Sequence, residues 1–393
     1  MLQLGERTSP SYLKMSFLIA IVSRIVLFCG SMVVPIPNES GLAISPLTAN
    51  TALDLGYYQW AREMYFGETQ VVIDAYIRFF TGNEAGYKFF LPGPLFPSLL
   101  HVFDYGPGNT LPLSMIYLLL SGGLVAGWLW WLWRNGVGRF WLYVFAVLPT
   151  PYWFTLNVST DLLFAGIVCA FWLFWFNANI PDVRRMTSVA VVVVLAVLLR
   201  PNSLSLLLFL SVDVLIWEVY LKGPGQARRR GLLFATLIAI LLVIFSLFYM
   251  PYFYWVVAVS ARIGYFGWLP EQYMTGLWPD FPTVLNRGLS SLALLAAKVL
   301  YLTGLRPSFG NTATPLVVLR ILPGIIMLPG LLWLLLRANW RVRFFVVFFL
   351  APILSGISQD RYVLPIQPVL FFYGVKAWGE IIKLCLRVRR TAT

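Results

Sequence analysis

A short segment after the first apolar run carries residues suited to acid–base chemistry. Within 50–67, Asp54, Tyr58 and Arg62 are spaced four residues apart, so they share one strip of a helix beside an apolar stripe. An amphipathic helix of this kind is typical of the plane of a membrane surface. A carboxylate held there could accept a proton from a substrate hydroxyl, which makes Asp54 a candidate general base. A structural role stays open, because Thr51-Ala-Leu-Asp54 also fits a capping box.

A second group consists of basic residues that fall outside the basic loops. Such cations are few, and each needs a partner or a function. They are Arg200, Lys298, Arg306, Arg320 and Arg361. A phosphate at the bilayer surface would supply a partner, since the arginine guanidinium suits bidentate phosphate contacts. A salt bridge or a phospholipid headgroup would satisfy them equally well.

Two further segments combine apolar residues with prolines or hydroxyls. Prolines interrupt the apolar stretch 88–101, which predicts a turn leading into a surface helix rather than a membrane span. The stretch 150–161 ends in polar residues at the start of a helix, where N-capping is the ordinary explanation. Burial of Asp161 at a membrane face would instead favour a role in a site.

Several signatures of other protein classes are missing. The sequence has no G-x-x-x-x-G-K-[ST] loop, no H-E-x-x-H and no paired-cysteine metal motif. His101 is the only histidine, which excludes metal sites built on several histidines. ATP-driven transport and zinc hydrolysis therefore lack support, and we expect neither a metal nor a soluble cofactor.

The composition indicates that these residues are positioned by membrane helices. Hydrophobic residues make up 59% of the chain and charged residues 11%, whereas a soluble domain carries about 25% charged residues. A helix needs about 20 apolar residues to cross a bilayer. The sequence predicts an all-α membrane bundle of about ten spans, over residues 15–35, 112–133, 139–156, 160–177, 186–200, 203–221, 231–257, 314–336, 342–357 and 362–379.

The distribution of Lys and Arg predicts the orientation of this single membrane domain, residues 1–393. The net charge of +13 lies in short loops between apolar runs, so it indicates a cytoplasmic side rather than a nucleic-acid partner. Residues 36–111 and 258–313 are then long outer segments, the first with amphipathic surface helices, and 380–393 is a basic cytoplasmic tail. Long ordered segments outside the membrane often carry function.

Four segments, in this order, resemble the GT-C superfamily of membrane glycosyltransferases. They are D-x-x-Y-Y-x-x-A-R-x-x-Y-x-G at 54–67, P-x-P-L-F-P at 92–97, the outer turn and helix start at 150–165, and R-Y-V-L-P-I-Q-P at 361–368. The likeness extends over most of 12–375 and includes protein O-mannosyltransferase and aminoarabinose transferase-like members. Those O-mannosyltransferases carry Asp-Glu where this chain has Asp54-Leu55. This departure from the family pattern argues against metal dependence and is compatible with a mechanism that uses a single base.

The resemblance implies a glycosyltransferase that uses a polyprenyl-phosphate-linked sugar as its donor. Asp54 would take the proton of the acceptor hydroxyl, with inversion at the sugar carbon. The donor phosphate would be stabilised by Arg361, Arg306, Lys298 and Arg200. Further substrate contacts are expected from Tyr57, Tyr58, Arg62, Asp161 and Tyr362.

Other functions fit the same sequence. A transporter or flippase for a lipid-linked sugar would share the apolar bundle and the buried cations, although no internal repeat is visible. A polysaccharide polymerase or ligase would share the lipid-linked donor, and a non-catalytic assembly subunit is a further alternative. The acceptor could be a glycan, a lipid or a protein, and we expect a bacterial inner membrane with the site facing the periplasm.

Overall fold

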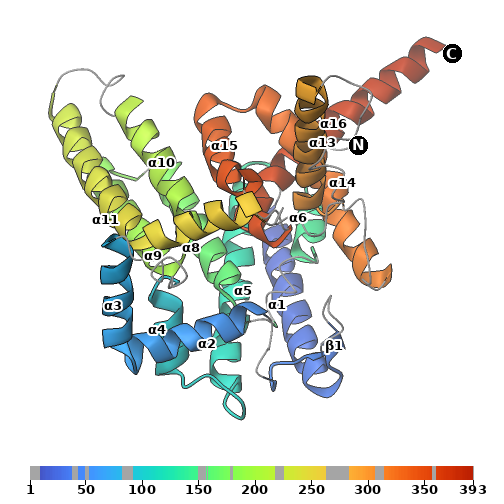
Figure 1. Cartoon of the computed structure of the whole chain (residues 1–393). Helices are drawn as coiled ribbons and strands as arrows, with labels where there is room; N and C mark the ends of the chain where they lie inside the picture. Colours follow the sequence, from blue (N-terminus) through green and yellow to red (C-terminus); the bar gives the residue numbers. More distant parts are fainter. Residues whose placement is uncertain are drawn as a thin grey trace.

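The computed structural model is a bundle of helices with one two-residue antiparallel strand pair (Figure 1). The structure describes residues 9–37, 43–48, 53–81, 92–148, 156, 158–177, 180–216, 225–262, 283–305, 314–355 and 360–392. Within these ranges the side chains of some residues, among them 53–57, 314–320 and 361, lie outside the description.

The elements follow one another in the order shown by the colours of Figure 1. The helices are α1 (Pro10–Val33), α2 (Leu53–Phe66), α3 (Thr69–Phe80), α4 (Leu95–Val102), α5 (Leu111–Arg134), α6 (Arg139–Ala146), α8 (Thr160–Trp175), α9 (Asp182–Leu199), α10 (Leu204–Asp213), α11 (Gln226–Arg262), α13 (Thr283–Leu302), α14 (Thr314–Arg337), α15 (Trp340–Ser355) and α16 (Gln367–Ala392). Two 3-10 turns are η2 (Pro201–Ser203) and η4 (Asp360–Val363), and β1 (Ile36–Pro37) pairs with β2 (Ala43–Ile44).

The predicted all-helical class is confirmed, and helices lie in all ten predicted ranges. Three of the described helices are long and apolar enough to cross a membrane: Pro10–Val33, Leu111–Arg134 and Arg229–Pro251. Thr160–Trp175, Pro201–Ile216 and Ile321–Arg337 are shorter apolar helices. The number of about ten spans therefore stays a prediction.

The first helix, α1, has one side that faces the protein and an opposite side that is apolar and exposed. Its buried residues, which include Ser16, Ala20 and Arg24, recur every three or four positions and form one stripe. This stripe packs against α5 and α6. Residues on the other side are apolar and exposed, among them Leu18 at 55% and Val26 at 63%. An apolar outer face is what a helix needs when protein covers one side and lipid covers the other.

The crossing of α14 and α16 depends on glycines. A Cβ added at Gly330 would collide with the carbonyl oxygen of Leu370 and the backbone nitrogen of Gly374. A Cβ at Gly374 would collide with the carbonyl oxygen of Ile326. Small residues allow two helix backbones to approach this closely, which is common where apolar helices pack without a hydrophobic driving force.

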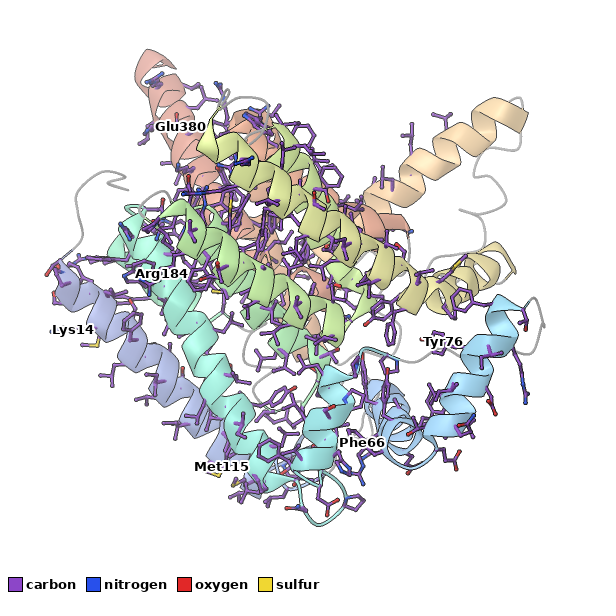
Figure 2. All side chains as sticks on the ribbon, turned by 90° about the vertical axis from the view of Figure 1, so that its left-hand side faces the viewer. Lys14, Phe66, Tyr76, Met115, Arg184 and Glu380 are labelled. Atoms are coloured by element: carbon purple, nitrogen blue, oxygen red, sulfur yellow. The ribbon has the colours of Figure 1, made fainter. Side chains whose placement is uncertain are left out.

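Helices α2, α3 and α4 lie together at one end of the bundle (Figure 1). Figure 2 places Phe66 and Met115 at this lower end of the molecule and Glu380 at the upper end. As predicted, the proline-rich stretch gives a helix of only 8 residues, α4, which is too short to span a bilayer by itself. This end of the bundle carries Tyr58, Asp161 and Arg200, three of the residues singled out by the sequence.

Candidate functional site

A buried ion pair lies at the centre of the candidate site. Arg200 Nη1 donates to Asp161 Oδ1 over 2.6 Å, and the Asp161 side chain is 4% exposed. Asp161 belongs to the first turn of α8, and Arg200 is the residue at which α9 ends. The guanidinium also lies 5.3 Å from the ring centre of Phe164 and 5.5 Å from that of Tyr362. Residues from two segments of the resemblance, 150–165 and 361–368, thus contact Arg200.

The surface helix α2 joins the same centre through Tyr58. The Tyr58 hydroxyl lies 3.3 Å from Thr160 Oγ1, next to Asp161. The Tyr58 ring meets Phe96 of α4 edge to face, with ring centres 4.8 Å apart. The segment 54–67 therefore reaches the residue beside Asp161, and the segment 92–97 packs behind it through Phe96. This convergence of four separated segments could not be read from their order alone.

The Ser159 hydroxyl is a buried polar group close to the ion pair in sequence. Ser159 is the N-cap residue of α8, but its side chain makes no capping hydrogen bond, so the N-capping explanation is wrong for this residue. Among the described residues, its buried Oγ has no hydrogen-bond partner. A buried unpaired hydroxyl costs about 1–3 kcal/mol, so such a group favours a position beside a ligand or an ordered water.

The proline-rich segment is held close to this centre by tyrosines. Tyr65 donates to the carbonyl of Pro92 over 2.7 Å, and Tyr249 donates to the carbonyl of Val197 over 2.8 Å. Between them, a Cβ at Gly93 would collide with Leu198 and the Tyr249 hydroxyl, so only glycine fits. Burial raises the pKa of Tyr65, which keeps its hydroxyl a donor.

Lys298 of α13 approaches the same region from the other side. Its Nζ donates to the carbonyl of Leu354 over 2.6 Å, near the end of α15, and the residue is 3% exposed. Helix α13 also packs against η4, which contains Arg361 and Tyr362. Burial lowers the pKa of Lys298 to about 8, so its amine gains and loses a proton close to neutral pH.

The remaining predicted residues differ in what the structure describes of them. Asp54 lies in the first turn of α2 and Tyr57 one turn later, but both side chains lie outside the described part, as does that of Arg361. Arg306 lies wholly outside the described residues. Arg62 makes polar contacts elsewhere, since its guanidinium donates to the Tyr105 carbonyl over 3.3 Å and pairs with Asp104 at 3.7 Å.

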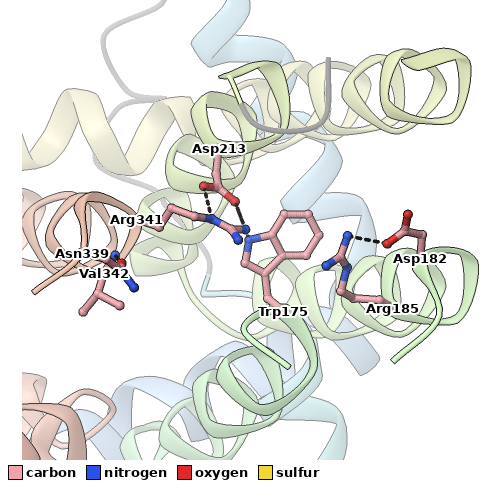
Figure 3. A network of polar contacts seen from close by, with 7 residues as sticks. All are labelled: Trp175, Asp182, Arg185, Asp213, Asn339, Arg341 and Val342. Carbon is pink, nitrogen blue, oxygen red and sulfur yellow. Dashed lines mark hydrogen bonds and ion pairs between the residues drawn. The ribbon is translucent and has the colours of Figure 1, made fainter. Parts of the chain in front are cut away.

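A second polar network lies at the opposite ends of the same helices (Figure 3). Asp213 accepts two hydrogen bonds from Arg341, at 2.8 and 2.5 Å, and a third from Trp175 Nε1 at 2.8 Å. Arg185 pairs with Asp182 at 2.9 Å and lies over the Trp175 ring. Trp175 is 14 residues after Asp161 in α8, so the two centres are about 20 Å apart.

This second network serves packing. The Asp213 carboxylate is fully buried and accepts a fork of two bonds from Arg341, the geometry that best satisfies such a pair. It joins the ends of α8 and α10 to the start of α15. In the sequence, Arg341 lies among the basic residues of a short loop and Asp213 was not singled out, although a carboxylate inside an apolar run is itself a signal.

Arg24 is another buried charge that the sequence analysis did not single out. It lies in the middle of α1 at 1% exposure, and its Nε donates to Ser121 of α5 over 3.1 Å. Its Nη1 donates to the carbonyl of Ala20 over 2.8 Å. The bond to Ser121 joins α1 to α5, and both bonds satisfy donors of a cation that lies within an apolar helix.

The described residues contain no group of three or more His, Cys, Asp or Glu side chains placed to hold a metal ion. Compared with protein-family models, curated proteins and solved structures, the chain gives no match. The argument for function therefore rests on the site. Its chemistry is that of a buried guanidinium with remaining donors, a second cation nearby, aromatic faces and an unpaired hydroxyl, a combination suited to an anionic ligand.

Proposed function

We propose that the chain is a membrane glycosyltransferase that moves a sugar from a polyprenyl-phosphate donor to an acceptor hydroxyl. The observation that carries this proposal is that Tyr58, Asp161 and Tyr362, from three segments of the resemblance, meet around Arg200 at one end of the bundle. Phe96 of the fourth segment packs against Tyr58. Four weak motifs that meet in space are far less expected by chance than four motifs in order. An apolar bundle suits a donor whose isoprenoid tail must lie in lipid.

The proposed topology has about ten spans with the site on the outer face. Asp161 begins α8 and Arg200 ends α9, whereas Arg184 and Arg185 begin α9 at its other end. Arg134 likewise ends α5 away from its start. Basic residues and candidate site thus fall at opposite helix ends, as the positive-inside rule requires of an outer site. We propose a bacterial inner membrane with the site facing the periplasm.

The reaction we propose is a single inverting displacement. Asp54 accepts the proton of the acceptor hydroxyl as that oxygen bonds to the anomeric carbon. The bond from this carbon to the donor phosphate oxygen breaks, and polyprenyl phosphate leaves. Arg200 and Lys298, with Arg361 and Arg306, stabilise the negative charge that develops on the leaving phosphate. No soluble cofactor takes part, because the lipid phosphate bond already activates the sugar.

A transfer assay in membranes tests the proposal. A panel of polyprenyl-phosphate sugars is offered to the wild-type chain and to Asp54→Asn, and we expect the substitution to lower transfer about 10²–10⁴-fold. Asp74→Asn is the matched control, because it makes the same change on the neighbouring helix α3. There the Asp74 carboxylate accepts a hydrogen bond from Gln70 at 2.9 Å. Full transfer by Asp54→Asn would exclude it as the base. Donor binding or flipping without transfer would favour a transporter instead.

A further inference from the structure

Helix α16 changes character abruptly at residue 380. Before this point its residues are buried or half-buried, with Gln367 and Val375 both at 2% exposure, and Trp378 Nε1 donates to the Ile325 carbonyl over 3.1 Å. Every side chain from 380 to 388 is exposed. Figure 1 shows this part of α16, in dark red, extending away from the bundle toward the C-terminus at the upper right. The same helix is thus a packed bundle helix in its first half and an uncovered one in its second.

The uncovered half has two chemically different faces. Ile381, Leu384, Cys385 and Val388 follow a three- and four-residue spacing and form an apolar face, with Leu384 62% and Val388 60% exposed. Lys383, Arg387 and Arg390 follow the same spacing on the opposite face. A helix with an apolar face and a basic face is the form that lies in a membrane interface.

The charges around this segment add to its basic character. Glu380 is the only carboxylate between 380 and 393, and it pairs with Lys383 over 2.7 Å. The hydrogen bond from Lys383 lowers the pKa of Glu380, and the positive charges of Arg387 and Arg337 act in the same direction. Arg337, at the end of α14, therefore extends the basic surface beyond α16.

We propose that residues 380–390 bind anionic lipid headgroups at the membrane surface, with the apolar face in the acyl boundary. Charge complementarity selects this occupant, because basic side chains are attracted to anionic headgroups while two copies of this helix would repel each other. Continuity also favours it. The predicted span 362–379 ends directly before this segment, so in the proposed topology the exposed half begins at the cytoplasmic bilayer surface.

Cys385 makes the proposal testable in the full chain, because it lies on the apolar face and is exposed. Cys29 is the other exposed cysteine and Cys169 is buried, so Cys29→Ser leaves one accessible thiol. An environment-sensitive fluorophore on Cys385 is read in nanodiscs of phosphatidylcholine alone or mixed with phosphatidylglycerol. We expect blue-shifted emission and quenching by brominated lipid in the anionic discs, and loss of both at high salt.

Charge substitutions separate lipid binding from a general effect of the membrane. Lys383→Gln, Arg387→Gln and Arg390→Gln together should lower the ratio of bound to free segment about 100-fold, since each cation contributes about a factor of five. Arg134→Gln, Arg229→Gln and Arg230→Gln remove as much charge from α5 and α11, and should leave the emission unchanged. Equal emission in both lipid mixtures, or an unaffected triple variant, would overturn the proposal. If the emission in detergent instead shifts to the blue as the protein concentration rises, the apolar face of this segment binds a second copy of the chain.

Discussion

At the scale of single residues, the ion pair between Asp161 and Arg200 is the most consequential feature. Arg200→Ala should destabilise the protein by about 3–5 kcal/mol, because it leaves the Asp161 carboxylate buried without its cation. Adding Asp161→Asn should recover part of that loss. Thermal unfolding of the single and double variants in detergent gives the coupling directly. Additive losses would mean that the two side chains do not depend on each other.

Lys298 leads to a prediction about pH. Its folded pKa of about 8 lies below the ordinary lysine value, so the amine becomes neutral as the pH rises through 8. If it contacts the donor phosphate, the KM for donor should rise above that pH. Lys298→Arg keeps its charge to much higher pH and should remove the rise. A donor KM that does not change between pH 7 and 9 would exclude Lys298 from the phosphate contacts.

The same lysine affects stability in a definite direction. Because folding lowers its pKa, the folded state disfavours the protonated amine, and stability falls as the pH drops from about 10 to about 8. Below that range the lysine is charged in both states and its contribution stays constant. Activity and stability thus depend on this group with opposite signs, so the two pH profiles can be told apart.

At the scale of elements, the glycines at the crossing of α14 and α16 decide how closely these helices pack. Gly374→Ala or Gly330→Ala should destabilise the protein by about 1–3 kcal/mol, because the new methyl group meets backbone atoms that cannot move aside. Gly123→Ala in α5 is the control, since nothing lies within 4 Å of an added Cβ there. Thermal unfolding of all three variants is the measurement. Equal unfolding temperatures would contradict the close crossing.

The helices themselves could be predicted from the sequence, whereas their neighbours could not. Apolar runs of sufficient length fix where helices form, which is why the range 314–336 matches α14 closely. Which helix packs against α14 depends on Gly330 meeting Gly374, and glycine alone does not name its partner. Asp213 and Arg341 likewise lie 128 residues apart, and no local pattern links them.

The candidate site was predictable in part for the same reason. Asp161 and Arg200 stood out because polar residues at the ends of apolar runs are costly without a partner. That they would pair with each other, rather than with a phosphate each, follows only from the packing of α8 beside α9. A paired arginine still has donors to spare, since a guanidinium carries five N–H groups. Its use for a phosphate is therefore compatible with the pair.

At the scale of the whole molecule, the short α4 decides the topology. With three spans between α3 and α9, Thr69 and Arg184 lie on opposite sides of the membrane. If the segment containing α4 also crossed, there would be four spans and the two residues would lie on the same side. Both side chains are exposed, and Figure 2 labels Arg184. Labelling these two residues therefore shows whether the number of membrane spans between them is odd or even.

We expect Thr69→Cys to react with a membrane-impermeant maleimide in intact cells, and Arg184→Cys to react only after the membrane is opened. The background is Cys29→Ser with Cys385→Ser, which leaves only the buried Cys169. The expectation counts α4 as no crossing, because its 8 residues extend about 12 Å and the hydrocarbon core is about 30 Å thick. It counts the predicted span 139–156 as a crossing, of which α6 forms the first 8 residues. Labelling of both positions from the same side would require a further crossing between them. The basic loops after α5 would then lie on the same side of the membrane as Thr69, and the outer position of the candidate site would be lost.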